Sequence, residues 1–185
     1  NHFKNSHIMK QTINLLCCLC TALATILFTG CSDDDNSGNP SKPDLEFYAL
    51  TSTNSLVKYN AKNSQNALST TAITGLQGGE NLLSIDFRPG TGQLYGLGSS
   101  RRVYIINTNT GAATALNATP FGVGLSTASL TGFDFNPTVD RIRVVTANGL
   151  NFRLNPETGE VAASDTNLSP GTPNVTAAAY TNNYA

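Results

Sequence analysis

The chain has 185 residues, with 11 Lys and Arg against 12 Asp and Glu, so its formal net charge at pH 7 is −1. Charged residues make up 12% of the sequence, well below the roughly 25% of an average soluble domain. The cations form no basic run, which excludes the electrostatic footprint expected of a nucleic-acid-binding protein.

The N-terminal part of the sequence has the pattern of an export signal. Residues 1–8 precede the first Met and look like upstream or non-native sequence. Lys10 then stands before an uncharged apolar stretch, residues 13–28, which is shorter than the about 20 residues of a spanning helix. A positive residue followed by a short apolar stretch and small residues predicts a secretory signal peptide over residues 9–30.

The end of the apolar stretch, Phe28-Thr29-Gly30-Cys31, resembles the lipobox of bacterial lipoproteins. This resemblance implies cleavage before Cys31 and a diacylglycerol on its thiol, so that the membrane is a partner of the protein. Together, the acyl chains of a mature lipoprotein form a stable anchor. Phe28 departs from the usual Leu. The alternatives are an uncleaved N-terminal anchor and a chance Cys behind an ordinary signal.

The residues directly after Cys31 are Ser32, Asp33, Asp34 and Asp35. They resemble the acidic surface-export signal of some Gram-negative lipoproteins, which implies a surface-exposed outer-membrane lipoprotein. A solvated acidic linker and a periplasm-facing or retained lipoprotein are the alternatives. Residues 31–43 are polar and contain Gly, Ser and Pro, and we interpret them as a tether to a domain that spans residues 44–185.

Cysteine and histidine restrict the chemistry of the mature domain. Cys17, Cys18 and Cys20 lie in the predicted signal peptide, and His2 and His7 precede it. The predicted mature domain therefore contains neither His nor a free Cys. This excludes Ser-His-Asp and Cys-His catalysis, disulfides and thiolate zinc sites.

The predicted domain contains a sequence repeat. Residues 86–111 and 134–159 align without a gap at a spacing of 48, with Asp, Phe, Pro, Asn, Thr and Gly at matching places. A partial earlier copy, residues 48–60, fits at a spacing of 47. A period of 40–50 residues is typical of β-propeller blades, each of which holds four strands.

One complete copy of the repeat predicts four short antiparallel strands. Apolar and β-branched runs at residues 82–87, 93–97, 102–107 and 112–116 alternate with turns rich in Pro, Gly, Asn and Ser. We therefore predict an all-β domain of propeller-like blades, with Phe87 and Phe135 packed between neighbouring blades. A β-sandwich is the alternative. Residues 175–182 read as the opening of a further blade, so we expect the domain to be incomplete at its C-terminus.

Several long motifs of the domain resemble the bacterial domain of unknown function 4394 family. They are Gly75-Leu76 with Gly79-Glu80, Asp86-Phe87-Arg88-Pro89, Thr91-Gly92-Gln93-Leu94-Tyr95, Asp134-Phe135-Asn136-Pro137, Asp140-Arg141-Ile142-Arg143-Val144-Val145, Arg153-Leu154-Asn155-Pro156 and residues 175–182. The resemblance covers about residues 47–185 and implies an exported β-propeller-like domain. It implies no activity, and it implies that the family's domain continues beyond residue 185.

The most polar cluster of the sequence comprises Asp134, Asp140, Arg141, Arg143 and Arg153. On a strand, Arg141 and Arg143 would share one face, with Arg153 on the adjacent strand. Such a group could bind a carboxylate or phosphate through bidentate hydrogen bonds. The alternative is an internal ladder of ion pairs with Asp134, Asp140 and neighbouring acids.

Asp86 and Asp134 occupy matching places in the two complete copies. A repeated position indicates a repeated structural role, such as accepting backbone N–H bonds in the following turn. Calcium is a possible ligand of the two carboxylates, because it prefers oxygen donors. Otherwise we predict no cofactor and no metal.

We predict a non-catalytic binding or scaffold domain of unknown ligand on a lipid-anchored envelope protein. The alternative is a carboxylate-dependent hydrolase or lyase acting on an extracellular polymer, with Glu80, Asp86, Asp134 and Asp140 as candidate residues, although no spacing selects a pair. We expect the larger aromatic residues to lie in the core rather than on a sugar-binding surface: Tyr95, Tyr104, Phe121 and Phe152.

Overall fold

The computed structural model of the chain describes residues 41–124, 131–171 and 173–181. The predicted signal peptide, the lipidation site Cys31 and the acidic Ser32, Asp33, Asp34 and Asp35 lie outside the described residues. All elements below belong to the unit that begins at Lys42.

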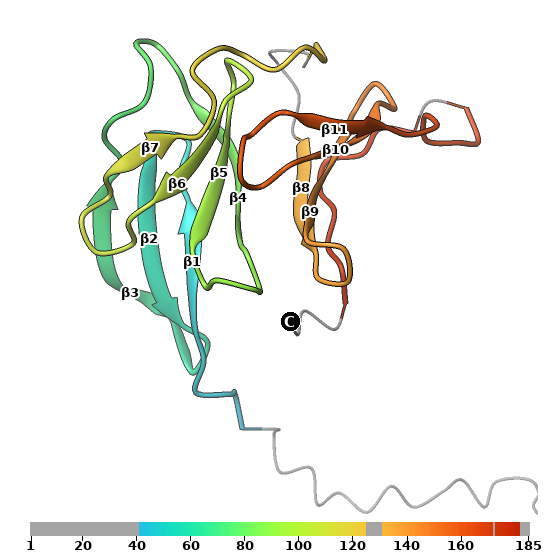
Figure 1. Cartoon of the computed structure of the whole chain (residues 1–185). Coiled ribbons are helices and arrows are strands. Elements are labelled where there is room, and N and C mark those ends of the chain that lie inside the picture. Colours follow the sequence, from blue (N-terminus) through green and yellow to red (C-terminus); the bar gives the residue numbers. More distant parts are fainter. Residues whose placement is uncertain (1–40, 125–130, 172, 182–185) are drawn as a thin grey trace, which may run out of the picture. The chain divides into compact units, whose positions relative to one another are not determined.

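The described residues form an all-β structure of three antiparallel sheets, which we call the first, second and third sheet (Figure 1). The first sheet holds β1 (Glu46–Leu50), β2 (Ser55–Asn60) and β3 (Asn63–Ala72). The second holds β4 (Leu82–Phe87), β5 (Leu94–Gly98), β6 (Val103–Ile106) and β7 (Ala113–Ala115). The third holds β8 (Thr131–Asn136), β9 (Arg141–Thr146), β10 (Asn151–Leu154) and β11 (Val161–Ser164).

In each sheet the strands follow one another in chain order, so every connection is a hairpin. This is the strand order of propeller blades. The second and third sheets confirm the predicted four-stranded units, whereas the first sheet has three strands among the described residues. The β-sandwich alternative is wrong, since the strands do not gather into two facing sheets. The predicted strands at residues 82–87, 93–97, 102–107 and 112–116 agree with β4 to β7 within one residue at each end.

The turns of the second and third sheets use the same local chemistry at positions 48 residues apart. Gly92 (φ 69°) and Asp140 (φ 49°) both adopt the left-handed conformation in the first hairpin of their sheets. In the last hairpin, the side-chain oxygen of Asn107 accepts the backbone N–H groups of Asn109 and Thr110. Asn155 accepts that of Glu157 in the same way. Such Asx turns fix the hairpins and hence the register of the strands.

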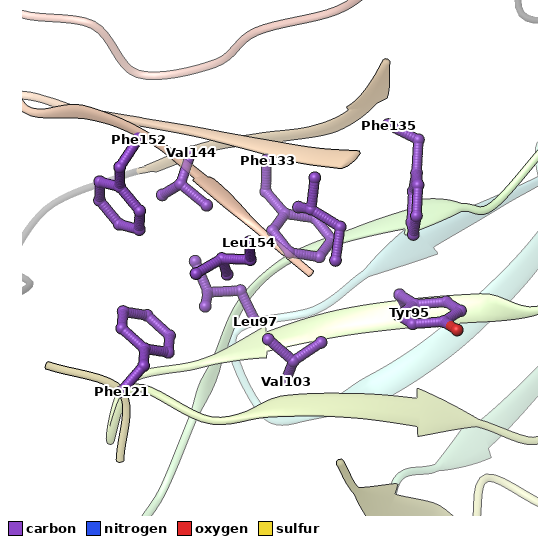
Figure 2. Close-up of a cluster of buried hydrophobic side chains, with 10 residues drawn as sticks. Tyr95, Leu97, Val103, Phe121, Phe133, Phe135, Val144, Phe152 and Leu154 are labelled. Carbon is purple, nitrogen blue, oxygen red and sulfur yellow. The ribbon is translucent and has the colours of Figure 1, made fainter. Parts of the chain in front are cut away.

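The three sheets pack against one another through two apolar cores. Between the second and third sheets lie Tyr95, Leu97, Val103, Phe121, Phe133, Phe135, Ile142, Val144, Phe152 and Leu154 (Figure 2). Between the first and second lie Leu56, Ile73, Leu82, Leu94, Tyr104, Ile106 and Ala113. The core positions predicted for Tyr95, Tyr104, Phe121 and Phe152 are confirmed, because each side chain is at most 1% exposed.

Candidate functional site

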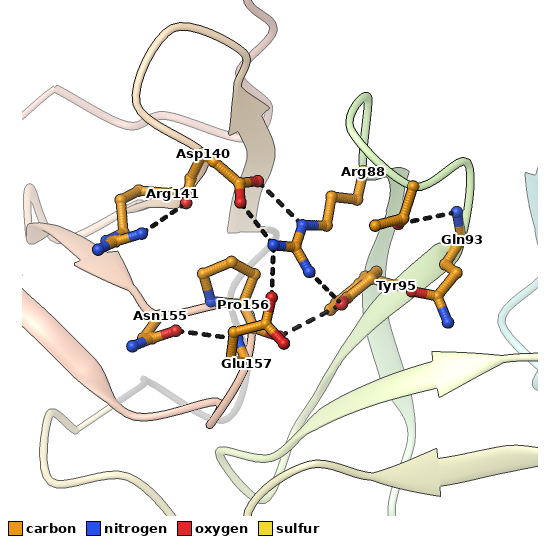
Figure 3. A network of polar contacts seen from close by, with 9 residues as sticks. Arg88, Gln93, Tyr95, Asp140, Arg141, Asn155, Pro156 and Glu157 are labelled. Atoms are coloured by element: carbon orange, nitrogen blue, oxygen red, sulfur yellow. Dashed lines mark hydrogen bonds and ion pairs between the residues drawn. The ribbon is translucent and has the colours of Figure 1, made fainter. Parts of the chain in front are cut away.

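Arg88 joins the second sheet to the third (Figure 3). It follows β4, and its Nε donates to Asp140 Oδ1 at 2.9 Å while Nη2 donates to Oδ2 at 2.5 Å. The same Nη2 lies 2.5 Å from Glu157 Oε1. This bidentate contact fixes both distance and orientation between the two sheets. The hydrogen bonds from Arg88 hold the pKa of Asp140 below its usual value.

Tyr95 of β5 extends the Arg88 contact into the core. Its hydroxyl accepts from Arg88 Nη1 at 3.3 Å and donates to the backbone carbonyl of Pro156 at 3.2 Å. Its ring meets Phe135 edge to face, with the ring centroids 5.0 Å apart. The Phe135 side chain is fully buried, so the packing predicted for it between neighbouring sheets is confirmed. One polar network and one aromatic pair therefore hold the same two sheets.

Asp86 and Asp134 form a second set of contacts that link successive units of the chain. Asp86 Oδ2 accepts the backbone N–H of Phe135 in the next sheet at 2.8 Å. Asp134 Oδ2 accepts the backbone N–H of Tyr180 at 2.6 Å. The prediction that these carboxyl groups accept from the following turn is wrong, since the donor belongs to the following unit. A fixed register between units brings that N–H within reach, and sequence spacing does not show it.

The two aspartates also interact with each other. Burial raises the pKa of both, against the lowering effect of the backbone N–H bonds. For Asp134, burial and the neighbouring Asp86 raise the pKa to about 6. Two close carboxyl groups cannot both ionise without repulsion, so the pair holds a proton at mildly acidic pH.

A third contact set surrounds Asp165, which follows β11. Its Oδ2 accepts from Arg143 Nη1 and, at 2.9 Å, from Arg153 Nε, while its Oδ1 accepts from Arg153 Nη2 at 2.8 Å. Hydrogen bonds from Arg153 and then Arg143 lower the pKa of Asp165. Arg143 Nε also donates to the hydroxyl of Tyr180 at 3.2 Å.

The structure distributes the five predicted cluster residues over these three places. Arg143 and Arg153 are direct cross-strand neighbours, as expected, but their shared carboxylate is Asp165 rather than Asp134 or Asp140. Asp140 lies in the Arg88 contact. Arg141 donates from Nη1 to the Asp140 backbone carbonyl at 2.8 Å. The alternative of internal ion pairs with neighbouring acids therefore holds for Arg143 and Arg153, which both bind Asp165. It is wrong for Asp134, whose carboxyl group accepts the N–H of Tyr180.

Glu80, a candidate catalytic acid in the sequence, lies in a fourth and separate polar cluster. Its Oε1 accepts from the backbone N–H and the hydroxyl of Ser100 at 2.9 and 2.6 Å. Its Oε2 accepts from the hydroxyl of Tyr104. Burial, followed by this hydrogen bond, raises the pKa of Tyr104 to about 12. Glu80 is 6% exposed, and its carboxylate is occupied on both oxygens.

A groove of about 230 Å³ between β1 and β4 is bordered by Asp86 together with Phe47, Tyr48 and Phe87. Of the candidate acids, only Asp86 lines it, whereas Asp134 is 7% exposed. In the described part of the chain, no three His, Cys, Asp or Glu side chains gather as a metal site would require. Nor does any helix of residues 41–124, 131–171 and 173–181 have the length and apolar character of a membrane span.

Sequence reasoning missed Arg88, Glu157, Asp165 and Tyr180. For Tyr180 the sequence held a signal. Tyr180 lies in the first strand-like segment after the unit of Asp134, as Phe135 lies in the first strand after the unit of Asp86. Arg88 and Asp140 are 52 residues apart and belong to different turns of the repeat. Their contact depends on how the sheets pack.

Comparisons with known proteins identify a family and give a weak match to a solved structure. The family described as "Domain of unknown function (DUF4394)" matches residues 55–185. No curated protein shows significant similarity. Among solved structures, BamB from Moraxella catarrhalis aligns at 12% identity with a TM-score of 0.33. The alignment covers 64% of this chain and 32% of that protein, so the chain corresponds to about a third of its length.

Proposed function

The chain belongs to the DUF4394 family, and from its inter-sheet contacts we propose that it is a non-catalytic binding or scaffold domain. We further propose that the domain is held to the bacterial envelope by a lipid on Cys31, on the surface of the outer membrane. The ligand we propose is neither a nucleic acid nor a cofactor.

The observation that carries this proposal is the use of the acidic side chains. Asp86 and Asp134 each accept a backbone N–H of the next unit, and Asp140 binds Arg88 of the preceding one. Glu80 is held by Ser100 and Tyr104 inside the second sheet. A general acid or base must reach its substrate, whereas these carboxyl groups are directed at their own backbone and side-chain donors. Their chemistry fits a rigid support better than a reacting centre.

One observation favours the second candidate, a carboxylate-dependent hydrolase or lyase. Asp86 and Asp134 lie together, and the pKa of Asp134 is raised to about 6, in the range of a general acid that works near neutral pH. Asp86 also borders the groove beside β1. The two carboxyl groups hydrogen-bond to each other, so they lie closer than the about 5–9.5 Å of a glycosidase pair and would act as a dyad that shares a proton.

An assay on extracellular polymers separates the two candidates. The purified chain and its Asp86→Asn/Asp134→Asn variant are incubated with a panel of polysaccharides and peptidoglycan, and new chain ends are measured. We expect no cleavage above the variant. Cleavage that disappears in the variant, with its fold intact by circular dichroism, would establish the hydrolase instead. A glycan array and a thermal-shift titration with calcium on the same samples test for binding.

The proposed anchor has its own test. Cells that express the chain are fed an alkyne-tagged fatty acid, and the protein is isolated and probed for the tag. We expect a labelled protein in the membrane fraction and an unlabelled one for Cys31→Ala. Protease treatment of intact cells then checks surface exposure: survival of the domain, while a known surface protein is digested, contradicts surface display.

A further inference from the structure

The second sheet carries a pocket of about 450 Å³, where β5 and β7 begin and β6 ends. This volume lies within the range of about 300–1,000 Å³ for small-molecule sites, whereas the groove between β1 and β4 is below that range. The size of the pocket therefore suits a small molecule rather than a folded partner.

The register of the strands brings side chains of the pocket to one face of the second sheet. Ile105 of β6 is the direct partner of Tyr95 on one side and of Thr114 of β7 on the other. Directly opposite residues share a face, and Tyr95 lies in the core toward the third sheet. Gln93 stands two positions before Tyr95 and therefore continues that face. Gln93, Ile105 and Thr114 thus line the pocket from the side turned to the third sheet.

The polar side chains of the pocket are free to meet a ligand. Within residues 41–124, 131–171 and 173–181, no hydrogen bond holds four of the lining side chains, namely Gln93, Thr108, Asn109 and Thr114. Figure 3 shows Gln93 bonded to its own turn through its backbone N–H, with its side-chain amide outside the Arg88 network. Amide and hydroxyl groups can each donate and accept hydrogen bonds, so the pocket offers both functions.

The pocket contains no ionisable side chain. At the matching positions of the third sheet, 48 residues later, Gln93 and Asn109 are replaced by Arg141 and Glu157. The repeat itself therefore does not require neutral residues at these places. A charged ligand would lose hydration in the pocket without gaining an opposite charge, so the lining selects a neutral one.

The balance of polar and apolar side chains narrows the ligand further. Small-molecule sites are mostly apolar with a few polar groups, whereas amides and hydroxyls make up much of this lining. Ile105, which is partly buried against the core, adds an aliphatic surface. A sugar ring matches this mixture, because its hydroxyl groups alternate with C–H groups. No aromatic ring lines the pocket, so hydrogen bonds rather than stacking would orient the sugar.

We propose that this pocket binds a small neutral saccharide. The amides of Gln93 and Asn109 and the hydroxyl of Thr114 bind its hydroxyl groups. Ile105 contacts its C–H groups. This inference rests on the proposed binding role and names the class of ligand.

The test is saturation-transfer difference NMR on the full chain, titrated with maltose, cellobiose, lactose and diacetylchitobiose. We expect saturable transfer to at least one of these neutral sugars, with the same Kd at low and high salt because no charge takes part. We expect no transfer to digalacturonate. Gln93→Ala and Thr114→Val should each weaken binding about three- to ten-fold, as expected for one lost hydrogen bond. Thr70→Val, the same change at an exposed site of β3, should leave the Kd within about two-fold.

The inference is overturned by an absence of transfer to all four neutral sugars, by equal binding of digalacturonate, or by a Kd that neither pocket variant changes. Gln93 and Thr114 are exposed and their side chains make no hydrogen bond among the described residues. Both variants should therefore keep the circular dichroism and melting curve of the parent. The cleavage assay tests the non-catalytic role separately. A neutral sugar that binds here and is also cleaved would contradict that role and support the pocket.

Discussion

At the scale of single residues, Asp86 and Asp134 show how the repeat uses an acidic side chain. Asp86 and Asp134 occupy matching places in the repeat, and the sequence alone therefore predicts a structural role for both. The donor could not be predicted, since the N–H of Phe135 is 49 residues from Asp86 and comes close only when the sheets pack. Nor does the sequence show that burial, together with the neighbouring Asp86, raises the pKa of Asp134.

Asp134→Asn should stabilise the protein near neutral pH. Burial and Asp86 raise the pKa of Asp134 to about 6 when folded. The stability that Asp134 contributes is therefore fully present below its unfolded pKa near 4, and it is lost as the pH rises through about 6 and the buried carboxyl group ionises. An Asn keeps the acceptor for the Tyr180 N–H, offers an N–H to Asp86 and carries no charge. Between pH 4.5 and 7.5, the free energy of unfolding in urea should fall by about 2 kcal/mol more for the parent than for the variant.

Asp134→Ala is the matched control, because it removes the charge and the acceptor together and should destabilise the protein at every pH. The lowered pKa values of Asp140 and Asp165 affect stability only at lower pH, below the window. Parallel pH profiles for the parent and the Asn variant would contradict the account.

Gly98 tests the Glu80 cluster. A Cβ at this position would lie 1.9 Å from Glu80 Oε1, so Gly98→Ala must displace the carboxylate from Ser100 and Tyr104. We expect a loss of about 2–3 kcal/mol, because a buried carboxylate loses its donors. Gly90→Ala, where no atom lies within 4 Å of the added Cβ, should change stability by less than about 0.5 kcal/mol. Equal effects in chemical denaturation would show that the Glu80 cluster adds nothing.

At the scale of elements, one aromatic contact recurs between successive units. Tyr48 of β1 meets Phe87 of β4, with the ring centroids 5.7 Å apart, and Tyr95 of β5 meets Phe135 of β8 at 5.0 Å. The 48-residue repeat predicts this kind of packing for Phe87 and Phe135. It does not predict that Phe87 is 37% exposed whereas Phe135 is fully buried.

Phe87 and Phe135 should therefore contribute differently to the free energy of unfolding. Phe135→Ala should cost about 3–5 kcal/mol, as for a large side chain removed from a closed core. Phe87→Ala should cost about 1 kcal/mol, because much of the ring is already in water. Urea unfolding measured by circular dichroism gives both values. A larger loss for Phe87 than for Phe135 would contradict the described burial.

The strands themselves were largely predictable, since alternating apolar runs and Asx turns are local features. The sequence did not predict which faces of the sheets pack against each other. Arg141 and Arg143 share a face by strand geometry, as predicted. Yet the acid between Arg143 and Arg153 is Asp165, which enters from the end of β11. Likewise, Asp140 pairs with Arg88 of the second sheet rather than with an arginine of its own strand. Long-range pairing of this kind depends on sheet packing, which a single sequence does not encode locally.

At the scale of the whole described domain, two apolar cores and a few polar contacts hold three sheets in sequence. Each sheet contacts its neighbours in the chain, which is the arrangement of a repeat protein whose stability arises from units and the interfaces between them. A lipid on Cys31 would place such a rigid support at a membrane. Asp86, Asp134 and Asp140 then serve the interfaces between units.

The most direct test of this account is a double-mutant cycle across the Arg88–Asp140 contact. The free energy of unfolding in urea is measured for the parent, Arg88→Ala, Asp140→Ala and the double variant. We predict a coupling of about 1 kcal/mol, modest because the Asp140 side chain is 45% exposed and solvent screens the pair. A coupling within about 0.3 kcal/mol of zero would contradict the claim that the polar side chains of this domain fasten one sheet to the next.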